Sequence, residues 1–169
     1  MLYETGMRRS ELAYLKLANI DLQSLSVKVL GKRNKERIIP IENELAHNIS
    51  RYLALREQVI AEQRAANPGY EEPDTLLVSS KGKAVNDAKI YQIVEHYMPT
   101  LSNAERTSPH IFRHSFATHM LDEGANIDAI KDLLGHSSLD STEIYTHVTK
   151  QHLKETYKHA HPRAQKNRR

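Results

Sequence analysis

Residues 108–135 carry two helical patterns in succession, and these constrain the fold more than any other part of the sequence. After a Ser-Pro pair typical of a helix start, apolar side chains recur at helical intervals. Asn126 is a favourable N-cap for a second helix at Ile127–Leu134, and Gly135 is a favourable stop. The sequence therefore predicts a pair of helices joined by a short connection.

Reactive side chains occupy defined places in this region. His110 and Arg113 lie one turn apart and share a face of the first helix. His136 follows the end of the second helix, and Tyr145 falls in a third short helix expected at about Leu139 to Val148. A cation, two imidazoles and a phenol form a set that can attack a phosphodiester without a metal ion.

Three short stretches have the character of β-strands. Ser26–Leu30 and Glu36–Pro40 alternate and contain β-branched residues, and residues 31–35 between them are typical of a hairpin turn. Thr75–Ser79 is apolar and β-branched and is expected to be the third strand. The sequence predicts a small antiparallel three-stranded sheet with Lys32 at the tip of its hairpin.

The remaining apolar periodicity is helical. It predicts a helix end at Met1–Thr5, closed by Gly6, and further helices at Ser10–Leu17, at Ile41–Ala66 and up to Met98. Together with the strands, these helices predict a mainly α protein with a small antiparallel sheet, an α+β fold.

The composition limits the classes of protein to which this chain can belong. A chain of 169 residues fits one domain with a sizeable core. The absence of cysteine excludes disulfides, thiolate chemistry and cysteine zinc sites. No apolar run is long enough to span a membrane, and a cytoplasmic location is expected.

The positive charge is concentrated at the C-terminus. The formal net charge is +3, but residues 151–169 hold six basic side chains against Glu155 alone, so residues 1–150 are net negative. Overall basicity is therefore a weak argument for nucleic-acid binding, and any such surface in residues 1–150 must be a local patch. Residues 162–169 are expected to be a disordered basic tail.

The histidines raise the possibility of a metal site. His110 and His114 have the i, i+4 spacing of helical zinc ligands, but Ile111 stands where an HExxH motif has glutamate, and no third ligand is obvious. We therefore expect no metal, and we interpret His114, His119 and His147 as packing or hydrogen-bonding residues.

Several segments together resemble a known family. In chain order they are LYETGMRRSEL, GKRNKERIIP, HIFRHSFATHML, LLGHSSLDSTEIYTHV and HPRA. In this order and with these gaps they closely resemble the tyrosine recombinases, the phage-integrase and Xer-like group. The resemblance extends to Arg163, and the LYETGMRRSEL segment selects Arg8 rather than Arg9 as the first arginine of the family.

The resemblance implies a set of catalytic residues and their roles. The hairpin selects Lys32 as the acid for the leaving 5′ oxygen, with Lys35 as the alternative because Arg33 stands where the family commonly has glycine. Tyr145 would be the nucleophile that forms a 3′-phosphotyrosyl bond. His110 would be a base or an orienting group. The full candidate set is Arg8, Lys32, His110, Arg113, His136 and Tyr145.

The resemblance also implies a fold and partners. Residues 1–161 would form a tyrosine recombinase catalytic domain that breaks and rejoins double-stranded DNA without a cofactor. Other protomers would assemble with it as a tetramer on DNA, and the C-terminal segment would dock on a neighbour or, alternatively, on its own domain. An N-terminal core-binding domain and the start of the first catalytic helix are expected to be absent from this chain.

Two other functions remain open at this point. One is a type IB topoisomerase that nicks and closes DNA as a monomer, and the wording of the HPRA and GHSSL…IYTHV segments argues against it. The other is a DNA-binding or regulatory module without turnover, and the complete set of candidate residues argues against that.

Overall fold

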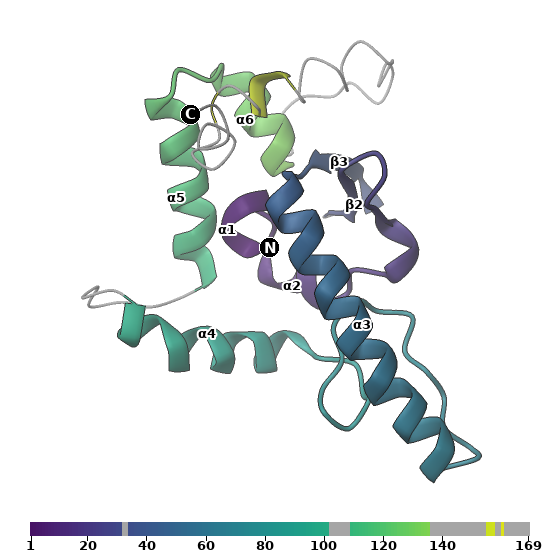
Figure 1. The fold of residues 1–169 in the computed structure, drawn as a ribbon. Coiled ribbons are helices and arrows are strands. Elements are labelled where there is room, and N and C mark those ends of the chain that lie inside the picture. The colour runs from purple at the N-terminus through teal and green to yellow at the C-terminus, as the bar shows by residue number, and fades with distance from the viewer. Residues whose placement is uncertain (32–33, 102–108, 136–154, 158–159, 161–169) are drawn as a thin grey trace.

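The structure, a computed structural model, describes residues 1–31, 34–101, 109–135, 155–157 and 160. In chain order the elements are α1 (Leu2–Thr5), α2 (Arg9–Ala13), η1 (Leu17–Asn19), β1 (Ile20–Asp21), β2 (Ser26–Leu30), β3 (Glu36–Pro40), α3 (Asn43–Ala66), α4 (Asp87–Leu101), α5 (Pro109–Asp122) and α6 (Ile127–Leu134). Helix α1 lies beside α5, and α3 extends away from the sheet (Figure 1). The fold is mainly helical with one small sheet, as the sequence predicts.

The sheet has the order β1-β2-β3, and both pairings are antiparallel. The hairpin is confirmed with its predicted bounds, and its register places Val29 opposite Arg37. The predicted third strand is wrong. Ile20–Asp21 pairs with β2 instead, while Thr75–Ser79 takes part only in isolated bridges.

Side chains from α3 explain why Thr75–Ser79 joins no sheet. Arg56 is buried and donates to the backbone carbonyls of Thr75 and Leu76, each at 3.2 Å. The hydroxyl of Tyr52 accepts from the backbone N–H of Val78 at 3.0 Å. Several backbone groups of this segment are therefore satisfied by α3, while others bond to the backbone of Leu15, Lys83 and Val85.

Helix ends follow the signals in the sequence. The side chain of Asn126 accepts from the backbone N–H of Asp128 at 2.8 Å and so caps α6. Gly135 ends α6 with φ 66°, and Gly6 ends α1 with φ 59°. Both glycines adopt the left-handed conformation that other residues rarely adopt, and all three signals are confirmed.

Some helix bounds differ from the prediction. Helix α2 ends at Ala13, before the predicted Leu17, because the backbone N–H of Leu17 donates to the carbonyl of Asp74 at 2.9 Å. Helix α3 begins two residues later than predicted, and α4 continues to Leu101 beyond the predicted Met98. No helix within the described ranges is long and apolar enough to cross a membrane.

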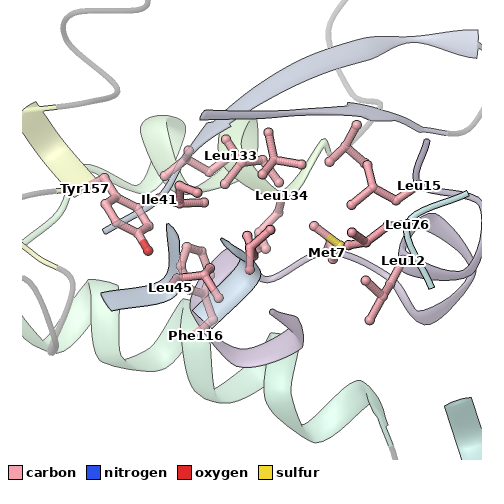
Figure 2. Packing of buried hydrophobic residues seen from close by; sticks show 14 of the residues in the cluster. Met7, Leu12, Leu15, Ile41, Leu45, Leu76, Phe116, Leu133, Leu134 and Tyr157 are labelled. Carbon is pink, nitrogen blue, oxygen red and sulfur yellow. The ribbon is translucent and has the colours of Figure 1, made fainter. Parts of the chain in front are cut away.

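The core holds the turn between α1 and α2 tightly. Figure 2 shows Met7, Phe116 and Leu134 within the buried cluster. A Cβ atom added at Gly6 would lie 2.6 Å from Cδ1 of Phe116 and 2.8 Å from Cδ2 of Leu134. Helices α5 and α6 thus fix the backbone just before Arg8.

Part of the C-terminal segment also belongs to this core. Tyr157 and Ala160 are buried, and the Tyr157 ring lies near that of Phe116, with 6.3 Å between centroids (Figure 2). The Tyr157 hydroxyl donates to the carbonyl of Glu4 at 2.7 Å. These residues therefore pack on their own chain, the second of the two arrangements considered from the sequence.

Candidate active site

Arg8 stands at the N-terminus of α2 and is held there by Glu11. Its backbone N–H donates to Oε2 of Glu11 at 2.7 Å, and its Nη1 donates to Oε1 at 2.8 Å. The Arg8 side chain remains one-third exposed, whereas the Glu11 side chain is buried. A guanidinium held from one side and open on the other is suited to binding an anion.

The neighbouring Arg9 has a different environment. Its Nε and Nη2 pair with the carboxylate of Asp87 on α4 at 2.5 and 2.6 Å, and its guanidinium carbon lies 5.3 Å from the centroid of the Tyr91 ring. Arg9 therefore ties α2 to α4. This contrast favours Arg8 as the residue available to a ligand.

Arg113 joins the ends of two other helices. Its Nη1 donates to the carbonyl of Gly6 at 2.8 Å, and its Nη2 donates to the carbonyl of Leu134 at 2.7 Å. Residue 113 lies on α5, so one half-buried guanidinium connects α5 with the C-terminal ends of α1 and α6. The positive charge also suits the two carbonyl ends.

The pKa of Arg113 reflects a cluster of positive charge. Burial, and then the charges of Arg8 and Arg37, lower this pKa to about 10, while Glu11 opposes the shift. Arg113 is still protonated at neutral pH. Three guanidinium groups around one carboxylate leave an excess of positive charge, which an anion such as a phosphodiester would balance.

Arg37 is the member of this cluster that the sequence analysis missed. It lies on β3, and both its side chain and that of Glu11 are only 5% exposed. Its Nη1 and Nη2 donate to the two carboxylate oxygens of Glu11 at 2.9 and 2.7 Å. The signal was present in the alternation of β3, which places Arg37 on the same inward face as Ile39.

The pKa of Glu11 shows that these contacts outweigh burial. Burial alone would raise the pKa of this carboxyl group. Hydrogen bonds from Arg37 and Arg8, with the positive charge of Arg37, lower it below its ordinary value of 4.5. Glu11 is therefore ionised at neutral pH, and it serves as the shared partner of two arginines.

The other sequence-predicted site residues are distributed unevenly. His110 lies exposed in the first turn of α5, three residues before Arg113. Lys32, His136 and Tyr145 lie outside the described residues. The structure thus brings Arg8 and Arg113 into one electrostatic cluster, and it places His110 on the helix that carries Arg113.

The histidines of α5 do not form a metal centre in the part of the chain that the structure describes. No group of three or more histidine, aspartate or glutamate side chains there could hold a metal ion. His119 instead lies 2.7 Å from the Tyr3 hydroxyl through its Nδ1 atom, which confirms its hydrogen-bonding role. His114 is exposed.

The architecture is that of tyrosine recombinase and integrase catalytic domains. The XerA recombinase structure superposes with a TM-score of 0.69 at 30% identity and covers 95% of this chain and 56% of that one. The XerH site-specific recombinase, bound to its difH substrate in a pre-cleavage complex, gives a TM-score of 0.63 at 30% identity. That match covers 93% of this chain and 44% of XerH.

The chain belongs to the phage integrase family, which residues 1–152 match. Tyrosine recombinase XerC of Staphylococcus carnosus is 41% identical over 168 residues, which is 99% of this chain and 54% of that protein. XerC of Thermodesulfovibrio yellowstonii is 39% identical over 162 residues, which is 96% of this chain and 52% of that protein. The chain spans about half the length of these relatives.

Proposed function

We propose that this chain is the catalytic domain of a site-specific DNA recombinase that cleaves and rejoins strands through a 3′-phosphotyrosine intermediate. The observation that carries the proposal is the cluster of Arg8, Arg113 and Arg37 around Glu11, whose net positive charge is partly buried. Family membership supports the same chemistry. Double-stranded DNA is the proposed substrate, in line with the DNA-bound XerH structure.

The reaction needs four groups in addition to the arginines. The phenol oxygen of Tyr145 bonds to phosphorus as the bond to the 5′ oxygen breaks, and His110 is the proposed acceptor or orienting partner for the phenol proton. Lys32 gives a proton to the leaving 5′ oxygen. His136 donates a hydrogen bond to a non-bridging oxygen. The phosphoester is kept as a protein–DNA bond, so rejoining requires no ATP.

The two arginines stabilise the negative charge that develops on the non-bridging oxygens of the phosphate in the transition state. A guanidinium stays cationic at working pH and matches phosphate oxygens with a planar fork. Arg113 remains protonated at neutral pH even with its lowered pKa of about 10. Because Arg8 and Arg113 are anchored from α2, α1 and α6, their charges are in place before the reaction begins. We propose that this arrangement replaces a metal ion.

We propose a tetramer on DNA in which C-terminal segments dock on neighbouring protomers. The burial of Tyr157 and Ala160 in their own chain implies that these two residues would have to be released or would stay in place while other parts of the segment make the contact.

The proposal is tested with a nicked suicide substrate, on which a covalent protein–DNA adduct accumulates. We expect Tyr145→Phe to form no adduct while binding DNA nearly as well as the parent chain. Arg8→Ala and Arg113→Ala should each reduce the cleavage rate by about 10²-fold or more, because each removes a charged donor to the transition state. Arg9→Ala is the matched control and should retain cleavage.

Four outcomes would contradict the proposal. A normal yield of adduct from Tyr145→Phe would remove Tyr145 as nucleophile. Loss of cleavage in excess EDTA that returns with a divalent ion would exclude metal-free chemistry. Relaxation of supercoiled DNA by a monomer, without recombinant products, would indicate a topoisomerase, and complete absence of adduct would indicate a binding module.

A further inference from the structure

Arg37 is a buried side chain at the meeting point of the hairpin, α2 and α6. Its Nε donates to the carbonyl of Leu133, in the last turn of α6, at 2.8 Å. Its Nη1 and Nη2 bind both carboxylate oxygens of Glu11. All three nitrogen atoms of the guanidinium are therefore used to join elements of the protein.

Two glycines lie against the same guanidinium. A Cβ atom at Gly31 would lie 3.4 Å from Nη1 of Arg37, and a Cβ atom at Gly135 would lie 3.1 Å from that atom. The next residues in the chain are Lys32 and His136. The backbone positions that precede two of the candidate catalytic residues are thus set by their approach to Arg37.

A third catalytic candidate is connected through Glu11. The carboxylate that Arg37 binds is the one that holds Arg8 by its backbone N–H and its Nη1. Any shift of Arg37 would move Glu11, and Arg8 would move with it. The planar guanidinium group of Arg37 therefore links Arg8, the hairpin and the end of α6.

We propose that Arg37 is a positioning residue for strand cleavage, which holds Arg8 through Glu11 and fixes the backbone at Gly31 and Gly135, the residues before Lys32 and His136, without touching DNA. This inference rests on the proposed function. The side chain is too deeply buried to contact a duplex, since residue 37 is 6% exposed. Its effect on the rate would come from geometry, because small displacements of catalytic groups are costly.

A purely stabilising role explains the arrangement less well. A buried ion pair contributes little net stability compared with apolar residues of the same volume. A guanidinium, in contrast to an ammonium group, fixes its partners in one plane. Arg37 uses that property to join α2 and α6 to its own strand, β3, and these are the elements that lead to candidate catalytic residues.

The chain offers a matched control in Arg56. It is equally buried, at 4% exposed, and it also combines an ion pair with backbone carbonyls through Glu72 and Leu76. Arg56 itself lies on α3, and its partners belong to the segment 72–76, away from the arginine cluster. The Arg56 variants therefore measure the effect of replacing a buried arginine that has only a structural role.

The experiment measures single-turnover cleavage at saturating DNA together with DNA affinity and unfolding midpoints. We expect Arg37→Lys and Arg37→Met to reduce the cleavage rate constant by about 10²-fold while DNA affinity changes little. Arg56→Lys and Arg56→Met should lower the unfolding midpoint but cleave at the parent rate while folded. Parent-like cleavage by folded Arg37 variants, or an equal loss in the Arg56 variants, would overturn the proposal.

A substrate with sulfur in place of the scissile 5′ oxygen tests the link to Lys32. A thiolate leaves without needing a proton, so this substrate should restore most of the about 10²–10⁴-fold loss expected for Lys32→Ala. It should also restore a large part of the loss in Arg37→Lys, but not that in Arg113→Ala. Rescue of Lys32→Ala without rescue of Arg37→Lys would overturn the hairpin part of the proposal.

The two proposals can fail separately. If sulfur does not rescue Lys32→Ala, the acid role of Lys32 in the proposed function is wrong, and Arg37 is judged by its cleavage rate against that of the Arg56 variants. If no variant or parent forms an adduct, the proposed function fails and the positioning role fails with it.

Discussion

Glu11 is the shared partner that holds two arginines of the candidate site, Arg8 and Arg37, in place. A carboxylate can accept several hydrogen bonds, and this one accepts from Arg37 and from both the backbone and the side chain of Arg8. Removing it would leave the buried guanidinium of Arg37 beside Arg113 without an opposite charge. The acidic residue is therefore a condition for packing the positive charge that the proposed phosphate binding requires.

This arrangement predicts a pH dependence of folding. Because the folded-state pKa of Glu11 lies below the ordinary 4.5, its contribution to stability is complete above about pH 4.5 and is lost as the pH falls through the folded pKa. We expect Glu11→Gln to lower the urea midpoint at neutral pH and to flatten the acid limb of the stability curve. Urea unfolding followed by circular dichroism from pH 3 to pH 7 measures both.

Glu36 supplies the control for that experiment. Its carboxylate pairs with Lys28 across the hairpin at 2.8 Å, but both side chains are about half exposed. Exposed pairs of this kind contribute little to stability. Glu36→Gln should keep the acid limb of the parent, and an equal flattening in both variants would show that Glu11 is not the responsible group.

At the level of single residues, the contact that holds Arg8 is local in the sequence, whereas the contacts of Arg37 are not, and Arg37 was missed. Arg8 and Glu11 have the i, i+3 spacing of side chains that meet on a helix, and they lie 2.8 Å apart. Arg37 meets Glu11 across 26 residues, and its carbonyl partner in α6 is 96 residues away. An inward-facing arginine on a strand was a visible signal, but its partners were not.

At the level of elements, the sequence correctly predicted those features whose cause lies within one short segment. The hairpin bounds and the Asn126 cap depend on neighbouring residues only, and both are confirmed. Strand β1 has two residues, too few for any periodicity, and it was missed. Thr75–Ser79 has strand character, but part of its backbone bonds to side chains of α3, a tertiary effect that no local pattern contains.

Helix α4 shows the same limit for packing. The apolar residues of its stripe divide into two groups, of which Ile90 and Val94 are buried. Ile93 and Tyr97 are 43% and 59% exposed. Periodicity identifies an apolar stripe on a helix, but how much of that stripe is buried depends on the elements that pack against it.

The turn between α1 and α2 gives a prediction at this scale. Gly6→Ala should destabilise the fold by about 2–5 kcal/mol, because alanine would adopt a left-handed conformation and its Cβ would also meet Phe116 and Leu134. The clash would push α1 away from α5 and α6. Thermal and urea unfolding of the variant measure the loss.

Gly124→Ala separates backbone strain from the clash. Gly124 has φ +79°, but no atom lies within 4 Å of a Cβ added there. That variant should lose only about 1–2 kcal/mol of stability, which is the cost of the backbone strain. Equal losses of stability in the two variants would mean that the close packing over Gly6 contributes nothing to stability. The turn would then not be held by α5 and α6.

At the scale of the whole molecule, the meeting of Arg8 and Arg113 could not be derived from patterns. Arg113 reaches the carbonyl of Gly6 across 107 residues, and only packing of α1 against α5 brings the two regions together. The family resemblance predicted their common site, whereas periodicity predicted only the helices that carry them. Residues 136–154, which include two of the candidates, lie outside the described part, and their placement stays a prediction.

The C-terminal contact offers a test of how the whole chain is organised in solution. Tyr157 is fully buried against Phe116, so Tyr157→Ala should lower the free energy of unfolding by about 3–5 kcal/mol. Tyr157→Phe keeps the ring and loses only the hydrogen bond to Glu4, so its loss should be about 1 kcal/mol. If the contact forms within one chain, the unfolding midpoint of the parent will not depend on protein concentration. A midpoint that rises with concentration, and a loss in Tyr157→Ala that grows with it, would instead show that a neighbouring copy supplies this residue.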